Sequence, residues 1–495
     1  MISGFVQMRA TYTRAMVVWI GLMLGSLFAA GMAADATSDR FPMAAGPAQP
    51  DVETLRNYEC PEWFRDAKFG IRTQWGPQSL PELGDGYAHN LYVRGRRANE
   101  FHVAHFGDPE KVGYDAVIAK WTGASFDAGA LVDRFAAAGA RYVVTLGVDR
   151  DNFDLWNSAL QPRNAVNLGP KRDVVGAWAD AVRARKLRFG VSEHLAPSPG
   201  FMAVAATGDA APAAADWPHE WYGRIRDLID QHEPDVLLME GGVPFGEVGR
   251  RLLAHYYNQG LARHGDLEVV GAVNSQPDPG SEYIDGIAVE DVERGSKAAL
   301  APQPWQCDTA LNDWVYDHDA PMRPAGAIIR QLVDVVSKNG NLLLDVPLRG
   351  DGALPAEAGA VLDEIGAWLK LNGEAIYGTR PWSIFGEGPT ETVGGPLGEN
   401  KTLPYTPDDI RYTAKRWFDK DVEHETIYAI LLGWPGAGEE VVLGAFPDGP
   451  KARPLGVVRL LGYDGALRMV RDRQGLHIQL PPEPPCSHAV VFRLD

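Results

Sequence analysis

The sequence predicts an α/β fold in which a (β/α)8 barrel of the TIM type, residues 53–380, precedes a C-terminal antiparallel β-sandwich, residues 381–495. Short apolar runs alternate with amphipathic segments in the first part, as expected for parallel strands joined by helices. From about Arg380 the pattern changes to short strands separated by Gly and Pro turns. A chain of 495 residues is also too long for one ordinary domain.

The expected barrel strands are eight apolar runs, at residues 69–73, 142–148, 188–191, 236–239, 268–273, 286–289, 304–306 and 341–346. Apolar residues at helical spacing predict helices between them, for example over 126–138, 173–185 and 325–338. The alanine-rich stretch 203–215 is interpreted as a surface loop over the barrel mouth. The β-sandwich strands are expected at 426–432, 440–443, 457–461, 476–480 and 489–494. We expect this domain to stabilise the barrel, and carbohydrate binding is the alternative.

The N-terminus predicts export. Arg9 and Arg14 precede an apolar run over residues 15–33, and small residues follow at its end. This pattern is typical of a signal peptide, here residues 1–34, followed by a linker at 35–52. The alternative is a retained membrane anchor, because the run approaches the roughly 20 residues that span a bilayer. We expect cleavage, a secreted or periplasmic protein, and no stable membrane insertion.

Composition excludes several classes of protein. The formal net charge of -18 argues against binding to nucleic acid, which requires a basic face. Cys60, Cys307 and Cys486 are too few and too scattered for a disulfide framework or a zinc site, although one disulfide remains possible. No metal-binding motif, dinucleotide fingerprint or serine-hydrolase elbow is present, so we expect no metal and no cofactor.

The most informative residue is Glu240, which ends the apolar run 236–239 and precedes Gly241 and Gly242. Catalytic groups of a (β/α)8 barrel stand at the carboxyl ends of its strands. Many of the other expected strand ends are also acidic or amide residues: Gln74, Asp149, Asp151, Glu193, Asn274, Glu290, Glu293, Asp308 and Asp345. Hydrolysis of a glycosidic bond needs two carboxyl groups, so this convergence predicts a glycosidase. Asp345 and Glu290 are more readily interpreted as supporting residues that hydrogen-bond or pair with a basic side chain.

Several segments resemble the α-L-fucosidase family, family 29 of the glycoside hydrolases. They are residues 63–71 with Trp75-Gly76-Pro77, residues 139–144 and 169–173, and the more specific blocks 333–344 and 372–379. The resemblance spans about residues 55–385. It implies the barrel fold, an oligosaccharide or glycoconjugate substrate, and a retaining mechanism. In the family the nucleophile is an aspartate at the position of Glu240, so the resemblance implies Glu240 as nucleophile, longer by one methylene.

The resemblance also reveals an altered sugar pocket. The family has His where this chain has Gln74, a His-His pair where it has Asp149 and Arg150, and an aromatic-Ser pattern where it has Ser192-Glu193-His194. We therefore expect changed specificity. Arg150 could bind an anionic group or pair with Asp149. The candidate substrate-binding residues are Gln74, Trp75, Asp149, Arg150, His194, Trp305 and Asp308.

The acid/base partner is predicted in the order Glu293, then Glu193, and Glu290 and Asp308 remain competitors for this role. Gln306 replaces the acid of a Pro-Trp-Glu pattern that is common in the family. The prediction is an exported exo-glycosidase. Two alternatives stay open: a glycosidase of the same superfamily acting on a different α-linked sugar, an anionic one included, by retention or inversion, and a non-catalytic carbohydrate-binding barrel. The oligomeric state is not predicted.

Overall fold

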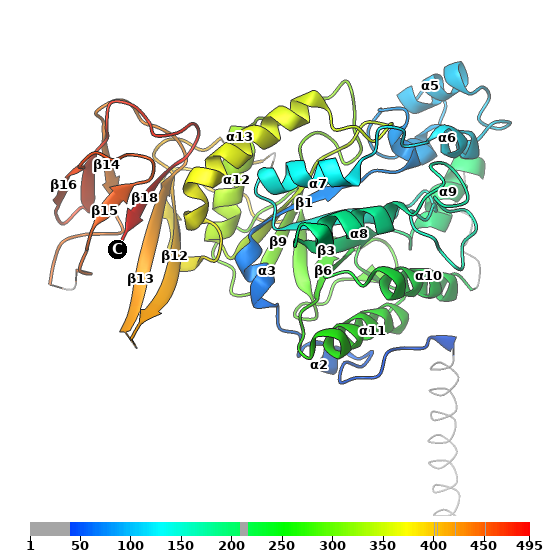
Figure 1. Ribbon diagram of the computed structural model, residues 1–495, viewed down its shortest axis with the longest axis horizontal. Coiled ribbons are helices and arrows are strands. Elements are labelled where there is room, and N and C mark those ends of the chain that lie inside the picture. Colours follow the sequence, from blue (N-terminus) through cyan, green and yellow to red (C-terminus); the bar gives the residue numbers. More distant parts are fainter. Residues whose placement is uncertain (1–39, 208–215, 400, 403, 421, 451) are drawn as a thin grey trace, which may run out of the picture.

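A computed structural model describes residues 40–495 except 208–215, 400, 403, 421 and 451 (Figure 1). Eight parallel strands close a barrel in the order β1-β10-β9-β8-β6-β4-β3-β2, which confirms the predicted fold class. The strands are β1 (Phe69–Thr73), β2 (Tyr142–Val148), β3 (Arg188–Glu193), β4 (Val236–Met239), β6 (Val270–Asn274), β8 (Val289–Glu293), β9 (Trp305–Ala310) and β10 (Gly340–Asp345).

The alternation of side chains along each strand produces two layers. Outward residues such as Phe69 and Ile71 join the large core between the strands and the surrounding helices. Inward residues such as Val144, Leu238 and Leu343 form a smaller apolar core inside the barrel. Towards the carboxyl ends of the strands the inward residues become polar and charged, which is where a barrel enzyme binds its substrate.

Two of the helices that cover the barrel, α7 (Ala128–Ala137) and α8 (Val174–Ala184), begin at aspartate caps. Asp127 accepts a hydrogen bond from the backbone N of Ala130 and caps α7. Asp173 accepts one from the backbone N of Gly176 and caps α8. Both predicted helices therefore begin one or two residues later than expected. Figure 1 shows α7 and α8 side by side along the barrel. The other helices are α2 (Val52–Leu55), α3 (Glu62–Ala67), α4 (Tyr87–Asn90), α5 (Arg97–His105), α6 (Tyr114–Lys120), α9 (Ser198–Thr207), α10 (Trp217–His232), α11 (Glu247–His264), α12 (Ala325–Ser337), α13 (Ala356–Asn372), and the 3₁₀ turns η1 (Pro77–Ser79) and η2 (Gly373–Ala375).

Some sequence predictions for the barrel are wrong. Residues 275–288 contain only β7 (Ser281–Glu282), which pairs with β5 (Val243–Pro244), and residues 294–304 contain no helix. Helices therefore do not separate all eight strands. The runs 286–289 and 304–306 begin and end too early, because the acids and amides within β8 and β9 conceal those strands in a hydropathy pattern. Residues 203–207 belong to helix α9 and not to a loop, while 208–215 lie outside the described residues.

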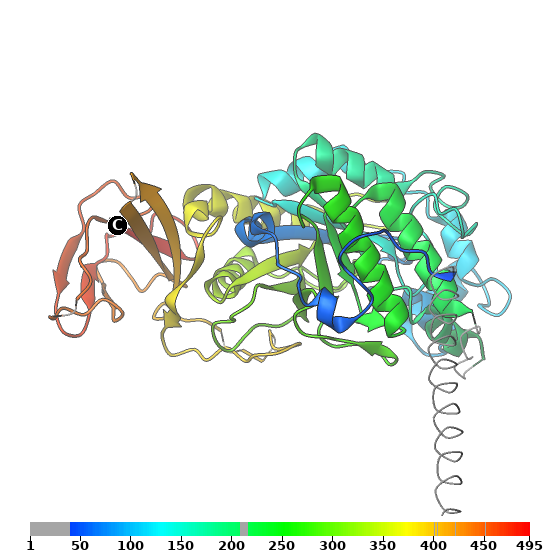
Figure 2. The ribbon, with the colours of Figure 1, turned by 90° about the horizontal axis from the view of Figure 1, so that it is seen from below.

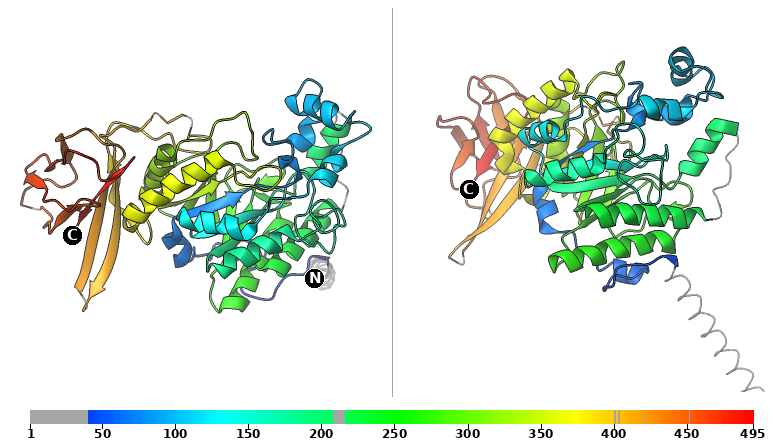
Figure 3. Two further views of the ribbon diagram at one scale, coloured as in Figure 1. Left: turned by 45° about the horizontal axis from the view of Figure 1, so that its top comes forward. Right: turned by 45° about the vertical axis from the view of Figure 1, so that its right-hand side comes forward.

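The C-terminal part is a β-sandwich, as predicted. One sheet has the order β11-β12-β13-β18-β15 and the other β14-β17-β16, and side chains from both, including Tyr412 and Ile478, form one core. This domain lies beside the barrel (Figure 2), and the β12–β13 hairpin projects from the rest of the C-terminal domain (Figure 3). The strands are β11 (Arg380–Glu387), β12 (Ile410–Asp419), β13 (Val422–Leu431), β14 (Glu440–Leu443), β15 (Val458–Leu460), β16 (Arg468–Arg471), β17 (Leu476–Gln479) and β18 (Val490–Leu494), of which β11, β12 and β16 were not predicted.

Two further expectations concern covalent and membrane links. Cys60, Cys307 and Cys486 all lie in the described part of the chain and are free thiols. Within residues 40–495, apart from the gaps given above, no helix is long and apolar enough to cross a bilayer. The predicted signal peptide, residues 1–34, lies outside the described residues.

Candidate active site

Arg72 stands at the centre of the barrel mouth, pointing inward from β1 with a side chain only 1% exposed. Its Nη2 lies 2.5 Å from Glu240 Oε1, its Nη1 lies 2.5 Å from Asp308 Oδ2, and its Nε lies 3.6 Å from Asp345 Oδ2. Nη2 also donates a hydrogen bond of 3.2 Å to Gln74 Oε1. One guanidinium therefore joins three carboxyl groups from three different strands: Asp308 lies within β9, Asp345 ends β10 and Glu240 follows β4.

Burial changes the charge of this cluster. It raises the pKa of Asp308 to about 7, with the charges of Glu240 and Glu293 adding to the effect and Arg72 opposing it. Burial likewise raises the pKa of Asp345 well above its ordinary value. Among the described residues, Asp308 Oδ1 and both oxygens of Asp345 have no hydrogen-bond partner. Near neutral pH the cluster therefore retains protons. Arg72 is then paired with less negative charge than three ionised carboxylates would carry.

Glu240 follows β4 directly, and its backbone N donates to the carbonyl of Glu193 on β3. Gly241 and Gly242 have φ values of 74° and 89°, in the left-handed region. A Cβ at Gly241 would also overlap the Asp278 carboxylate. The two glycines turn the chain sharply, and Gly241 leaves room for the side chains of Asp278 and His194 beside Glu240.

A second set of polar groups lines the mouth on the side of β2 and β3. His194 Nε2 lies 2.8 Å from Asp278 Oδ2, while its Nδ1 lies 3.9 Å from Asp149 Oδ1 and 4.0 Å from Glu240 Oε2. Burial alone would lower the pKa of His194, but the hydrogen bond to Asp278 and the charge of Glu240 outweigh burial and raise it. His194 is therefore biased towards the protonated form beside Glu240.

Asp149 and Arg150 extend this network. Gln78 Nε2 donates to Asp149 Oδ2, and the backbone N of Arg150 donates to Asp149 Oδ1. The guanidinium of Arg150 pairs with Asp85 at 2.7 Å and lies 3.6 Å from Asp149. Arg150 is thus already neutralised by protein carboxylates.

The two acid/base candidates lie in different environments. Glu293 is half-buried at the carboxyl end of β8, where Asn274 Nδ2 lies 3.4 Å from its Oε2. Glu193 is almost fully buried, and its Oε2 accepts hydrogen bonds from the backbone N of Leu195 and from Trp221 Nε1 of α10. Burial raises the pKa of Glu193 to about 7. Glu293 lies among the mouth residues, whereas Glu193 is directed into the barrel wall.

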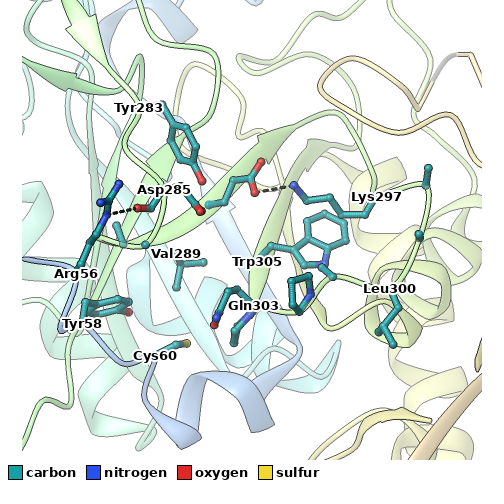
Figure 4. A pocket seen from close by; sticks show the side chains of 18 residues that line it. Arg56, Tyr58, Cys60, Tyr283, Asp285, Val289, Lys297, Leu300, Gln303 and Trp305 are labelled. Atoms are coloured by element: carbon teal, nitrogen blue, oxygen red, sulfur yellow. Dashed lines mark hydrogen bonds and ion pairs between the residues drawn. The ribbon is translucent and has the colours of Figure 1, made fainter. Parts of the chain in front are cut away.

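The two tryptophan candidates also lie in the wall. Trp75 stacks on Phe126 with ring centroids 4.8 Å apart and donates to the carbonyl of Arg349. Trp305 faces outward from β9 and donates to the carbonyl of Lys338. It borders a cavity of about 520 Å³ on the outside of the barrel, beside the segment 294–304 that has no helix (Figure 4). Neither indole joins the carboxylates at the mouth.

The sequence reasoning missed Arg72, Asp85, Asp278 and Trp314. The guanidinium of Arg72 lies over the Trp314 ring at 5.4 Å from its centroid. Arg72 carried one detectable signal, because it is a charged residue at an inward position of an otherwise apolar strand. The others lie in loops, where no local pattern announces a role.

The barrel, the carboxylates at its mouth and the C-terminal sandwich agree with one family. A model described as Alpha-L-fucosidase matches residues 37–374, and one described as Alpha-L-fucosidase C-terminal domain matches residues 405–495. The chain belongs to the α-L-fucosidase family. It is accordingly a glycoside hydrolase.

Relatives resemble this glycoside hydrolase over most of its length. The plasma α-L-fucosidase of Rattus norvegicus is 30% identical over 453 residues, which cover 87% of this chain and 90% of the relative. The human plasma α-L-fucosidase is 29% identical, over 87% of this chain and 88% of its own. The Thermotoga maritima α-fucosidase in complex with fucose has a TM-score of 0.71 at 27% identity and covers 90% of this chain and all of its own.

The described residues contain no group of three or more His, Cys, Asp or Glu side chains placed to hold a metal ion. The polar groups at the mouth are instead arranged as pairs and hydrogen-bond chains. Carboxyl groups at the mouth can transfer protons and act as nucleophiles.

Proposed function

We propose that the protein is an exo-acting α-L-fucosidase that works by retaining double displacement, with Glu240 as nucleophile and Glu293 as acid/base. The observation that carries the proposal is the position of Glu240, at the end of β4 between Arg72 and His194. The names of the relatives and the fucose complex of the Thermotoga maritima α-fucosidase support the choice of sugar.

In the first step, Glu240 attacks the anomeric carbon while Glu293 gives a proton to the departing oxygen. The product is a covalent glycosyl-enzyme and a free alcohol. In the second step, Glu293 takes a proton from water, which attacks the same carbon and releases the sugar with its original configuration. Glu293 suits this role because it is half-buried at the mouth and can exchange protons with water.

We propose that Gln74, Asp149, Arg150, His194 and Asp308 form the polar surface that the sugar meets. Together these side chains offer donors and acceptors to hydroxyl groups. Because Arg150 is already paired with Asp85, a neutral sugar such as fucose fits this surface better than an anionic one. The proposed substrate is therefore an oligosaccharide or glycoconjugate with a terminal fucose.

We further propose that residues 1–34 direct export and are removed, leaving a secreted or periplasmic enzyme. The support is Arg9 and Arg14 before the apolar run, together with relatives described as plasma enzymes. N-terminal sequencing of the protein recovered outside the cytoplasm should find a start near residue 34 or 35. An intact Met1 on that protein would contradict cleavage.

The direct test uses 4-nitrophenyl α-L-fucoside, with nitrophenyl glycosides of other sugars as a specificity panel. We expect turnover of the fucoside, and NMR during the first turnovers should show the α anomer of fucose. Treatment with 2-deoxy-2-fluoro-α-L-fucosyl fluoride, followed by peptide mass spectrometry, should locate the covalent sugar on Glu240. A β anomer as first product would rule out retention, and a label on another residue would remove Glu240 from the proposed role.

A further inference from the structure

We propose that Arg72 is a positioning residue for Glu240. Arg72 holds Oε1 of Glu240 on the side of the barrel interior and leaves Oε2 as the oxygen that attacks the sugar. This inference rests on the proposed role of Glu240 as nucleophile. It assigns different tasks to the two oxygens of one carboxylate, and it gives a function to an arginine that no sequence pattern had identified.

The contacts of the two oxygens differ. Oε1 lies 2.5 Å from Arg72 Nη2, and Oε2 lies on the side of His194, 4.0 Å from Nδ1. The Arg72 side chain is 1% exposed and the Glu240 side chain 14%. Arg72 therefore approaches Glu240 from the closed interior of the barrel, while the more accessible part of the carboxylate remains available at the mouth.

Arg72 is held in place independently of Glu240. Asp308 binds Nη1, Asp345 lies near Nε, Gln74 accepts from Nη2, and the Trp314 ring lies over the guanidinium. An anchor with four other contacts does not need to reorganise when Glu240 reacts. Such an anchor matters for glutamate in particular, because its side chain has one more rotatable bond than aspartate and a nucleophile misplaced by about 1 Å can lose about 100-fold in rate.

The charge of Arg72 is directed mainly to Glu240 on the acid side of neutrality. Burial raises the pKa of Asp308 to about 7 and that of Asp345 well above its ordinary value, so these two carboxyl groups compete less with Glu240 for the charge of Arg72. Other charged or titratable groups also act on this cluster. His194, Arg150 and Glu193 surround Glu240, Asp278 and Asp149 face His194, Glu293 and Asp291 face Asp308, and Arg294 faces Asp345. Arg72 lies nearest to the Glu240 carboxylate, at 2.5 Å, whereas His194 Nδ1 lies 4.0 Å away.

The test compares the full-length protein with its Arg72→Met and Arg72→Lys variants. The rate at which 2-deoxy-2-fluoro-α-L-fucosyl fluoride labels Glu240 is measured against pH, together with kcat and KM for 4-nitrophenyl α-L-fucoside. Arg72→Met should lower kcat about 100-fold or more with a smaller change in KM. The acid-side midpoint of the labelling profile should rise by about one to three pH units, because an adjacent positive charge has been removed. Arg72→Lys should recover part of both losses.

Arg411→Met is the matched control. Arg411 is also buried and ion-paired, with Asp334 at 2.7 Å, but lies at the contact between α12 and β12. This variant should lose stability without moving the midpoint. An unmoved midpoint in Arg72→Met, or a loss of rate equal to that of Arg411→Met, would overturn the inference.

The remaining outcomes are also decisive. If Arg72→Met does not fold, Arg72→Lys decides alone: a kcat and midpoint equal to those of the unaltered protein would reject the positioning role, and a lowered kcat with a shifted midpoint would support it. If the unaltered protein is never labelled at Glu240, the proposed function itself has failed. Labelling at Glu240 that is indifferent to Arg72 would reject only the present inference.

Discussion

Replacing Glu240 with glutamine tests the proposed chemistry with the smallest change of shape. The amide occupies nearly the same volume but lacks the negative charge that attacks the anomeric carbon. Without a nucleophile the glycosyl-enzyme cannot form, so we expect kcat/KM for an aryl fucoside to fall by about 10³-fold to 10⁴-fold. A loss of that size corresponds to roughly 4 to 5.5 kcal/mol of transition-state stabilisation.

The same substitution should have little effect on stability, and the structure gives the reason. Breaking a buried ion pair costs about 3–5 kcal/mol where the remaining charge has no other partner. Here Arg72 keeps Asp308 at 2.5 Å and Asp345 at 3.6 Å. Removing the Glu240 charge also relieves the repulsion that helps to raise the pKa of Asp308. We therefore expect a loss below about 1.5 kcal/mol and a decrease in Tm of no more than a few degrees.

The measurements are initial rates on 4-nitrophenyl α-L-fucoside and a thermal unfolding curve for each variant. Glu290→Gln is the control, because Glu290 is also a half-buried carboxylate paired with a cation, Lys297 at 2.6 Å, but borders the outer cavity. The control should retain nearly full activity. Turnover by folded Glu240→Gln within about tenfold of the unaltered enzyme would refute the nucleophile assignment.

Three further predictions follow from individual contacts. Asp278→Asn should lower the pKa of His194, because the hydrogen bond that raises it is weakened, and NMR titration of the ring should detect the change; an unaltered titration would contradict it. Glu193→Gln should flatten the pH dependence of stability: the folded-state pKa is raised from 4.5 to about 7, so stability is full below about pH 4.5 and decreases by roughly 3 kcal/mol as pH rises through 7. Unfolding curves at about pH 5 and pH 8 test this, and an equally steep decrease in the variant would reject it. Trp305→Phe should lower Tm through loss of the bond to the Lys338 carbonyl and leave KM unchanged, whereas a raised KM would place Trp305 in substrate binding after all.

The strands predicted best are those whose buried side chains are mostly apolar. The runs 69–73, 142–148 and 236–239 coincide with β1, β2 and β4 because the interior below the mouth is apolar. The prediction failed at β8 and β9, where acids and amides occupy inward positions and break the apolar run. These residues belong to the candidate site, so function itself obscured the strand pattern.

The sequence predicted which residues belong to the candidate site better than it predicted their contacts. Glu240, Asp308, His194 and Asp149 were expected at strand ends and do lie together at the mouth. The role of Arg72 could not be derived, because its contact with Asp308 joins residues separated by 236 positions. The direction of the Glu193 side chain could not be predicted either. Its neighbours in the sequence point into the barrel, whereas Glu193 points outward to Trp221 on α10.

The positions at which the sequence is expected to differ from the family pattern lie in one connected network. Gln74 and Glu240 both contact Arg72, Glu240 lies beside His194, and His194 lies beside Asp149. A change at any of them alters the charge that its neighbours experience. Restoring a histidine at position 74 alone, for example, would place a second basic group against Arg72, where Gln74 now supplies a neutral acceptor. The specificity of this mouth is therefore a property of the whole network, and effects of substitutions within it should not add.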